Sequence, residues 1–488
     1  MAAIITEKFR QHNAEQFFES FSEASASTYY LFIGKSSPFS VSTSGGDDNS
    51  PPTPNDDVVL EQHKWDSMLA AKLISSSDVV YCAPRRNWTN STTYDMYEHD
   101  ISVSNPTSSG ATNLWDSTFY FMTSEYKVYK VLDNNGGTAY SGVEPTTTSA
   151  IPFELGGYTL QYMYTLSVSN IDKFLTSDFI PVVTDSTISA AAANGSIDTV
   201  RITAGSGYTD GTYYTAIDGD GSSGIVEIVV SGGAIQPQGS SGTNVFAAGT
   251  GYTFATVDLT DTYSDNALTL SSSIGAGTGG SVTPIISPRG GHGFNAVEEL
   301  GAHYVMMNTK LEQAEGDDVT VANDFREVGI VKDPFNFGTT TVSSASTRRQ
   351  SYAIKMAAAP STDYTIDEKI TQSTTGAVGR VVEWDATNNI LYYVQERFAD
   401  FGINAAGNYV AFSGANTVTG ATSLAAAIPS STASENVTLT GGTVLTFTTG
   451  YANPELEPDS GHILYVENRR PISRASDQTE DIKIVVEF

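Results

Sequence analysis

Short apolar runs at alternating positions, separated by turn residues, recur along this chain and constrain its fold more than any other feature. At the end of the sequence, Ile482, Ile484, Val486 and Phe488 occupy every second position, which places all four on one face of a strand. Residues 378–394 have the pattern of a hairpin whose strands flank an Asn-Asn turn. Charged residues make up only 16% of the chain, whereas Thr, Val, Tyr, Ser and Gly are abundant, as many short strands joined by turns require. The sequence therefore predicts a mainly β protein.

Three segments have a helical pattern instead. Residues 6–23 place several phenylalanines at spacings compatible with one helical face, and Thr6 can cap the first turn. A second helix is predicted at 58–74 and a short one near 295–301. Helices are therefore expected to be few and short.

The composition changes along the chain and suggests several domains. Residues 185–284 are almost free of basic residues and contain a weak internal echo, "GSGYT" at 205–209 and "GTGYT" at 249–253. We interpret this segment as a β module inserted into a loop of its host. The predicted division is an N-terminal core region at 1–184, an inserted Gly/Ser/Thr-rich β module at 185–284, a continuation of the core at 285–345, a second small β module at 346–450, and a C-terminal strand region that completes the core at 451–488.

The net charge excludes some classes of partner. With 25 basic and 55 acidic residues, the formal charge is −30, and a surface of that sign repels nucleic acid and anionic membranes. No run approaches the roughly 20 apolar residues of a membrane span. Cys82 is the one cysteine, so neither an intrachain disulfide nor a cysteine-based metal cluster can form. We expect no nucleic-acid partner and no membrane insertion.

The sequence carries no motif that points to catalysis or to a cofactor. Two stretches match the pattern G-x-G-x-x-G, at 219–224 and 275–280, but strand-like runs follow them and not the helix that a dinucleotide requires. Asp218 and Asp220 have the spacing of the first ligands of a calcium loop, but no acidic residue closes such a loop. We interpret all these stretches as turns, and we expect no catalytic residue, no cofactor, no metal ion and no enzymatic activity.

Two arginine pairs are unusual in so acidic a chain. They occur in "CAPRRNW" and in "ENRRPI", each beside a proline. Arginine binds carboxylates in bidentate fashion and is enriched at protein interfaces, so the pairs fit either an interface or an internal ion pair. The candidate interface residues are Arg85, Arg86, Trp88, Glu467, Asn468, Arg469, Arg470, Asp477 and Gln478.

Several motifs spread along the chain resemble one known family. They are "ITEKFR" (5–10), "FIGKSSPF" (32–39), "APRRNW" (83–88), "VYKVLD" (128–133), "FREVGIVKDP" (325–334) and "ILYVENRRPISRASDQTEDIKI" (463–484). Together they resemble the baseplate wedge subunit called gene product 8 of T-even-like contractile-tailed phages. The resemblance lies mostly in 1–184, 285–345 and 451–488; it leaves out 185–284 and is weak over 346–450.

The resemblance implies a structural protein without catalysis, built from β-sandwich-like domains. It implies a homodimer that packs into a wedge of the tail baseplate, against gene products six, seven and ten, after assembly in the host cytoplasm. It also implies that the wedge contacts rearrange when the tail contracts.

An alternative of another class stays open from the residues themselves. Modules rich in Gly, Ser, Thr and Tyr, such as 185–284, suit contact with carbohydrate. The chain could then be a receptor-binding or tailspike-like protein that contacts host glycans through its β modules.

Overall fold

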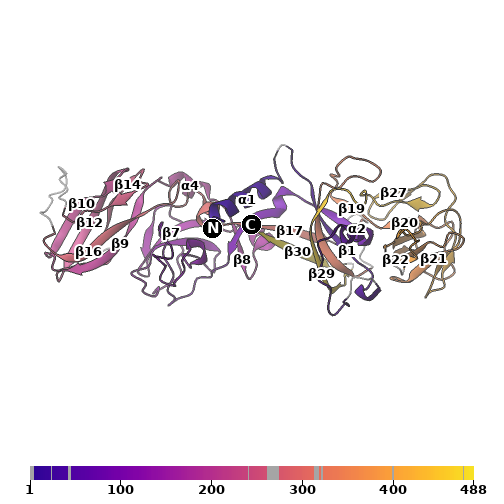
Figure 1. Ribbon diagram of the computed structural model, residues 1–488, viewed down its shortest axis with the longest axis horizontal. Coiled ribbons are helices and arrows are strands. Elements are labelled where there is room, and N and C mark those ends of the chain that lie inside the picture. Colours follow the sequence, from indigo (N-terminus) through magenta and orange to yellow (C-terminus); the bar gives the residue numbers. More distant parts are fainter. Residues whose placement is uncertain are drawn as a thin grey trace. The chain divides into compact units, whose positions relative to one another are not determined.

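We describe the fold from a computed structural model (Figure 1). It describes residues 5–23, 25–41, 46–239, 241–260, 274–312, 318–319, 323–397, 401–475 and 477–488, with only the backbone described at 41 and 58–62. About 40% of the structure is strand and about 10% helix. The prediction of a mainly β, multi-domain protein is therefore confirmed.

The chain divides into two compact units, and each is built from separated stretches of sequence. Unit 1 comprises residues 1–16, 80–306 and 485–488. Unit 2 comprises residues 17–79 and 307–484. This division groups the chain differently from the five predicted segments, which stay a prediction.

Unit 2 contains an antiparallel five-stranded sheet with the order β19-β2-β1-β18-β29. Its central strand β1 is buried at every position, and a cluster that includes Tyr30, Phe32, Trp65 and Met68 packs around it. The bounds of these elements and of the helical turns nearby are β1 (Tyr29–Gly34), β2 (Met68–Ile74), β18 (Phe325–Lys332), β19 (Thr347–Arg349), β29 (His462–Ile472), α2 (Val58–Ser67), η1 (Phe39–Val41) and η2 (Ser76–Asp78).

The predicted helix at 58–74 is wrong in its second half. Helix α2 ends at Ser67, and residues 68–74 form strand β2, which pairs with β1 on one side and β19 on the other. A run such as Met-Leu-Ala-Ala-Lys-Leu-Ile suits a helix locally. Here its backbone pairs with the two flanking strands, and most of its side chains are buried. Tertiary pairing therefore overrides helix propensity here.

A seven-stranded sheet of order β25-β24-β21-β22-β23-β20-β28 makes up the other large sheet of unit 2. The predicted hairpin is confirmed: β22 and β23 pair antiparallel, and Asn389 in their turn has a positive φ of 54°. The strands are β20 (Tyr352–Lys355), β21 (Lys369–Gln372), β22 (Val378–Asp385), β23 (Ile390–Val394), β24 (Val418–Gly420), β25 (Ala426–Ala427) and β28 (Tyr451–Ala452), with the separate hairpin β26 (Glu435–Thr438) and β27 (Val444–Phe447).

Unit 1 contains the four-stranded sheet β4-β5-β7-β6 and strands of the sheet β30-β17-β3-β8. The unit boundary falls within β3, β17 and β30. The strands are β3 (Val79–Pro84), β4 (Tyr120–Met122), β5 (Lys127–Asp133), β6 (Phe153–Leu155), β7 (Tyr158–Thr165), β8 (Phe179–Val182), β17 (Tyr304–Glu312) and β30 (Thr479–Glu487). The helices are α1 (Glu7–Glu19), α3 (Val168–Phe174), α4 (Ser186–Ala191) and α5 (Ala296–Glu299), with the turn η3 (Leu114–Asp116).

The predicted first helix is shorter than expected, and the predicted terminal strand is present. The amide of Phe9 donates to the Thr6 hydroxyl at 3.3 Å, which confirms the cap, but α1 ends at Glu19 instead of residue 23. Phe9 is 55% exposed, so the predicted phenylalanine face is buried only in part. Strand β30 contains Ile482, Ile484 and Val486 and ends one residue before Phe488, and of these four predicted positions Ile484 is buried.

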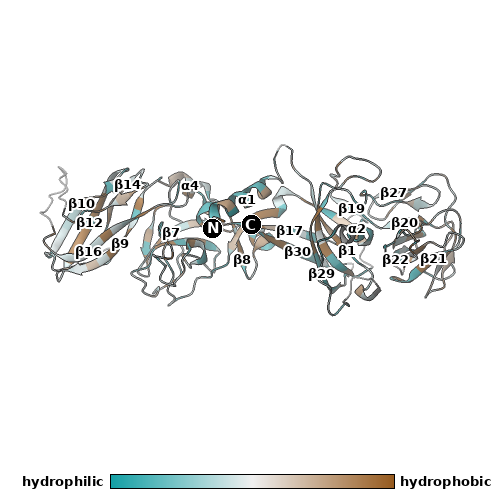
Figure 2. Cartoon of the chain, viewed as in Figure 1, coloured by the Kyte–Doolittle hydropathy of each residue, from teal (hydrophilic) through white to brown (hydrophobic). Residues whose placement is uncertain are grey.

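Residues 197–286, which we call the β9–β16 region, have a hydrophobic cluster of their own. A β9–β16 pair packs against the sheet of β10, β12, β13 and β14, and Figure 2 shows hydrophobic stretches, in brown, on these strands. The strands are β9 (Ile197–Ser206), β10 (Gly211–Ala216), β11 (Asp218–Gly219), β12 (Ser222–Ser231), β13 (Ala234–Ile235), β14 (Asn244–Thr250), β15 (Ala255–Thr256) and β16 (Thr278–Ile286).

The internal echo and the two glycine motifs of the sequence are one structural device used twice. The ring of Tyr252, from "GTGYT", lies where a Cβ on Gly221 would stand, and its hydroxyl accepts the Gly224 amide at 3.1 Å. The ring of Tyr208, from "GSGYT", lies in the same way on Gly277, and its hydroxyl accepts the Gly280 amide at 2.9 Å. Each tyrosine therefore sits in a cradle made by the other half of the region, and only glycine leaves room for it.

Candidate interface residues

The first arginine pair lies in unit 1, directly after β3, and bonds mainly to backbone carbonyls. Arg85 donates from Nη1 to the Thr176 carbonyl at 2.7 Å. Arg86 donates from Nη2 to the Trp115 carbonyl at 2.9 Å, and its guanidinium lies 4.5 Å from the centroid of the Tyr120 ring. Both side chains are half-buried. They therefore hold loops to the strand end, and no ion pair to them is seen in the described part of the chain.

Three buried nitrogen atoms close to this pair have no hydrogen-bond partner among the described residues. They are Nη1 of Arg86 and Nε1 of Trp88 and Trp115. The ring of Trp88 meets that of Tyr140 edge to face, with centroids 5.8 Å apart. A buried donor without an acceptor is unfavourable by about 1–3 kcal/mol, so these three nitrogens are unusual features of this part of unit 1.

The second arginine pair lies in unit 2, on β29 at the end of the five-stranded sheet. Glu327 pairs with Asn468 and Phe325 with Ile472, so three residues of β29 stand opposite one of β18. The strand bulges at these three residues, Arg469, Arg470 and Pro471, and bulges at sheet edges turn side chains outward. Both arginines are exposed.

Three polar side chains form a short row along the exposed side of β29. Arg469 Nη2 lies 3.0 Å from a carboxylate oxygen of Glu467, and the Tyr465 hydroxyl donates to the same oxygen at 2.7 Å. Burial, together with Glu467, raises the pKa of Tyr465 to about 12. An ion pair this exposed contributes little to stability. The side chains of the row can therefore contact a partner protein at little cost to the fold.

Asn468 points to the other side of β29 and has an internal role. Its Nδ2 donates to the Pro52 carbonyl at 2.8 Å, and its Oδ1 accepts from Lys64 at 3.5 Å. Lys64 also forms a buried ion pair with Glu327. Asn468 therefore fixes the loop before α2 to the sheet.

Asp477 and Gln478 are exposed on the turn that precedes β30. The Gln478 amide donates to the Ala475 carbonyl at 3.1 Å, which closes the turn. Sequence reasoning missed the pair that supports it: Arg474 Nε donates to Glu480 at 2.5 Å, and both side chains are buried. The opposite charges six residues apart around a turn were the available signal.

The structure thus separates the nine predicted residues into two groups. Arg85, Arg86 and Trp88 belong to unit 1, whereas the six between 467 and 478 belong to unit 2. Within the second group it brings Glu467 and Arg469 together and turns Asn468 away.

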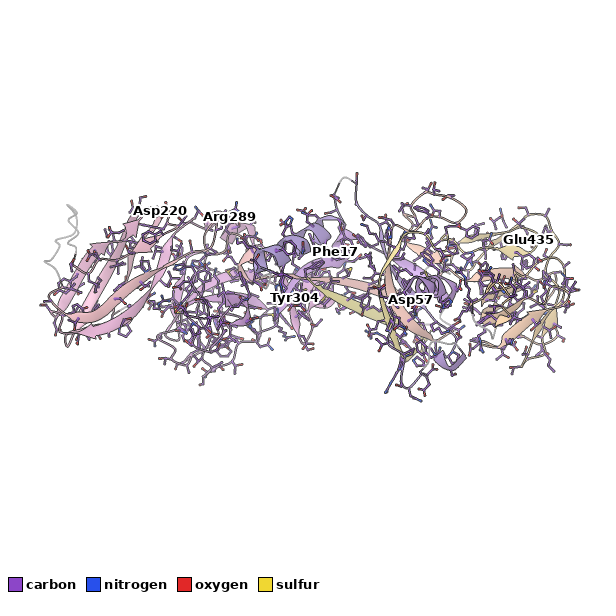
Figure 3. The ribbon with its side chains drawn as sticks, viewed as in Figure 1. Phe17, Asp57, Asp220, Arg289, Tyr304 and Glu435 are labelled. Carbon is purple, nitrogen blue, oxygen red and sulfur yellow. The ribbon has the colours of Figure 1, made fainter. Side chains whose placement is uncertain are left out.

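The stretches that resembled ligand motifs are structural. Both glycine motifs lead into strands, β12 and β16, as predicted. The Asp220 carboxylate, labelled in Figure 3, accepts the amides of Thr253 and Phe254 and the Thr253 hydroxyl, and these bonds lower its pKa to about 2. Within the described ranges, no group of three or more His, Cys, Asp or Glu residues could hold a metal ion. Among the same residues, no helix has the length and hydropathy needed to cross a membrane.

Comparison with known proteins gives a match to a family model. Residues 3–148 match the family model described as Bacteriophage T4, Gp8. The match makes this chain a structural protein of a phage tail baseplate, a component of the virion that is assembled in the host cell. Within that class, residues 3–148 are similar to the gene product 8 family of baseplate wedge proteins, which supports the resemblance that the motifs indicate. No curated protein matches the chain.

Proposed function

We propose that this chain is a homodimeric subunit of the baseplate wedge, that it holds neighbouring wedge proteins together, and that its contacts rearrange when the tail contracts. The observation that carries the proposal is the family match over residues 3–148. By the same resemblance, the neighbours are proteins of the gene product six, seven and ten types. Rigid β domains joined through polar contacts suit an interface that must let go and form again.

The exposed arginines on β29 support contact with an acidic partner. The chain carries −30 overall, so two copies or two acidic neighbours repel unless basic side chains lie between them. Arg469 and Arg470 are exposed on a sheet edge, with Asp477 and Gln478 on a turn a few residues further along the chain. We propose that these four residues contact a partner, and that Glu467 orients Arg469. We also propose Arg85, Arg86 and Trp88 as a second contact, since the unpartnered nitrogens of Arg86 and Trp88 lie there.

The test is charge reversal in the full chain. Arg469→Glu with Arg470→Glu should abolish or strongly weaken co-purification with the other wedge proteins of the same phage, while the isolated variant keeps its wild-type circular dichroism spectrum. Arg289→Glu is the matched control, because Arg289 is an exposed arginine in unit 1 (Figure 3). Loss of folding in the double variant, or wild-type assembly, contradicts the role given to the pair.

The oligomeric state is tested separately. Light scattering coupled to size exclusion should give twice the mass of one chain for the wild type. A monomer or a trimer would contradict the homodimer and would leave the family assignment intact.

We also propose that the glycine-rich segment is an inserted module, and that the rest of the chain folds and assembles without it. The structure suggests where to cut: Ile188 and Ile285 pack into the clusters of the β4–β7 sheet and its neighbours, so both should stay. Ile197 and Ile286 are cross-strand partners, so a short glycine linker can replace residues 197–284. The shortened chain should keep the mass of the full-length oligomer, and failure to fold would contradict the insertion.

A further inference from the structure

The outward side of the sheet in the β9–β16 region carries a small cluster that its core does not use. On β12, Val226, Ile228 and Val230 belong to the hydrophobic cluster inside, so alternation places Ile225 and Glu227 on the opposite side. Glu227 is the cross-strand partner of Tyr214 on β10 and of Asn244 on β14. These residues therefore form one row across three strands.

Two aromatic rings meet above the central strand of this row. The rings of Tyr214 and Phe246 come from β10 and β14, which flank β12, yet their centroids are 5.2 Å apart at an angle of 77°. Ile225 is only 8% exposed although it lies on the outward side, as expected if the two rings cover it. Phe246 itself is 49% exposed. We call Tyr214, Ile225, Glu227, Asn244 and Phe246 the Tyr214 face.

The polar groups of the Tyr214 face are a carboxylate, a carboxamide and a phenol. Burial and the nearby Glu227 carboxylate raise the pKa of the Tyr214 phenol, and both Glu227 and Asn244 are half-buried. Between residues 185 and 286 the one basic residue is Arg201, and it is paired with Glu98 at 3.1 Å and Asp100 at 3.0 Å. The face therefore offers an anion no basic partner from its own region, which disfavours phosphate, sulfate and acidic sugars.

We propose that the Tyr214 face binds a neutral carbohydrate. One exposed aromatic ring offers an apolar surface for the C–H side of a sugar ring, and the carboxylate and carboxamide beside it can accept and donate hydrogen bonds to hydroxyl groups. The apolar part consists of three side chains, far less than the roughly 800 Å² per partner of a stable protein interface. This site goes beyond the role in the baseplate and does not depend on it.

The experiment uses the full-length chain, fluorescently labelled, on an array of neutral oligosaccharides built from glucose, galactose, mannose and rhamnose. Any saccharide that binds is then titrated against variants by calorimetry. We expect Phe246→Ala to weaken binding by at least tenfold, because it removes the exposed ring, and Glu227→Gln to weaken it by a smaller factor. Phe254→Ala is the matched control: Phe254 is 62% exposed on the turn before β15, and its loss should leave affinity unchanged.

Each other outcome overturns the proposal. Failure of every neutral saccharide to bind would exclude the site. Equal loss in Phe246→Ala and Phe254→Ala would show binding elsewhere in the region. A tetralysine peptide that binds the wild type where no saccharide does would show that Glu227 and the rings form a cation site instead. Because Phe246 is exposed, unchanged circular dichroism is expected in all variants.

Discussion

Two regions of unit 1 stabilise their interiors with different chemistry. In the β4–β7 sheet, Lys130 forms an ion pair with Glu299 in which both side chains are fully buried, and the Lys130 ammonium lies 5.1 Å from the centroid of the Tyr97 ring. Burial lowers the pKa of Lys130, and the nearby Glu299 carboxylate opposes that shift. Asp133, on the same strand, is also buried.

The interior of the β9–β16 region contains no buried ion pair among the described residues. Between residues 199 and 286, the buried polar side chains other than the tyrosines are those of Thr199, Thr215 and Thr243. Carboxylates such as Asp220 and Glu227 lie outside this core, and burial raises the pKa of Asp198 at the start of β9. The hydroxyls of Tyr208 and Tyr252 accept backbone amides of glycines, and Tyr252 also donates to the Ile217 carbonyl at 3.0 Å.

The two regions show two ways in which a sequence can fix the packing of a core. A buried ion pair tolerates small changes of shape but not the loss of one partner, because the remaining charge is then left in a low-dielectric site. A tyrosine in a glycine cradle is indifferent to pH in the physiological range, but a single methyl group cannot be added without moving the ring. The predictions that follow test this contrast.

Removing one member of the buried pair should have the largest effect. Lys130→Met leaves the Glu299 carboxylate buried without its cation, so the β5 amides should lose about 3–5 kcal/mol of protection in native-state hydrogen exchange. Adding Glu299→Gln should recover most of the loss, since a carboxamide oxygen can still accept the Gly293 and Asn295 amides that now bond to Glu299. A double variant as unstable as the single one would contradict the electrostatic explanation.

A change of pH should affect the β4–β7 sheet and leave the glycine cradles unchanged. Burial raises the pKa of Asp133 to about 6, above its value in the unfolded chain, so the folded state holds the proton more tightly. The free energy of opening of β5 should therefore fall by about 3 kcal/mol as the pH rises from about 4 to about 6. Asp133→Asn should remove this dependence. Protection of the Gly224 and Gly280 amides, corrected for intrinsic exchange, should stay level, and a parallel fall there would break the contrast.

A change in the shape of the core should have the smallest of the three effects. Gly221→Ala places a methyl group in the Tyr252 ring and should reduce protection of the β12 amides by about 1–3 kcal/mol. Gly277→Ala should act alike on β16, because its methyl group would meet Tyr208 in the equivalent cradle. Gly232→Ala is the control: its φ is +63° but no atom lies within 4 Å of an added Cβ, so it reports backbone strain alone. Gly221 and Gly277 have no positive φ, so this strain does not add to their loss, and unchanged β12 protection in Gly221→Ala would show that the cradle is not what selects glycine.

The sequence predicts the local features well where the pattern is strong. The hairpin of β22 and β23, the Thr6 cap and the strand after Asp481 are all present. The prediction of one helix over 58–74 was wrong in its second half, because a run with helical propensity becomes a strand when β1 and β19 lie on either side of it. The glycine motifs lead into strands, as predicted, although their ends already belong to β11, β12 and β16 and are not turns. The sequence does not reveal that each motif holds the tyrosine of the other half.

For the candidate interface, the sequence could identify residue types and not their surroundings. It marked both arginine pairs because bulky cations are rare in so acidic a chain. It could not distinguish Arg86, which bonds the Trp115 carbonyl 29 positions away, from Arg470, which is exposed on a bulge. That difference depends on which segments fold beside each arginine.

By itself, then, the sequence determined the mainly β class, the positions of many turns and the resemblance to a family, since these depend on local pattern and on short motifs. The tertiary structure alone decided which charges are paired inside. Lys130 and Glu299 are 169 positions apart, and Lys35 and Glu396, whose ion pair spans 2.6 Å, are 361 apart. The physical reason is that a buried charge is acceptable only beside its partner, and which partner that is depends on chain segments brought together by folding.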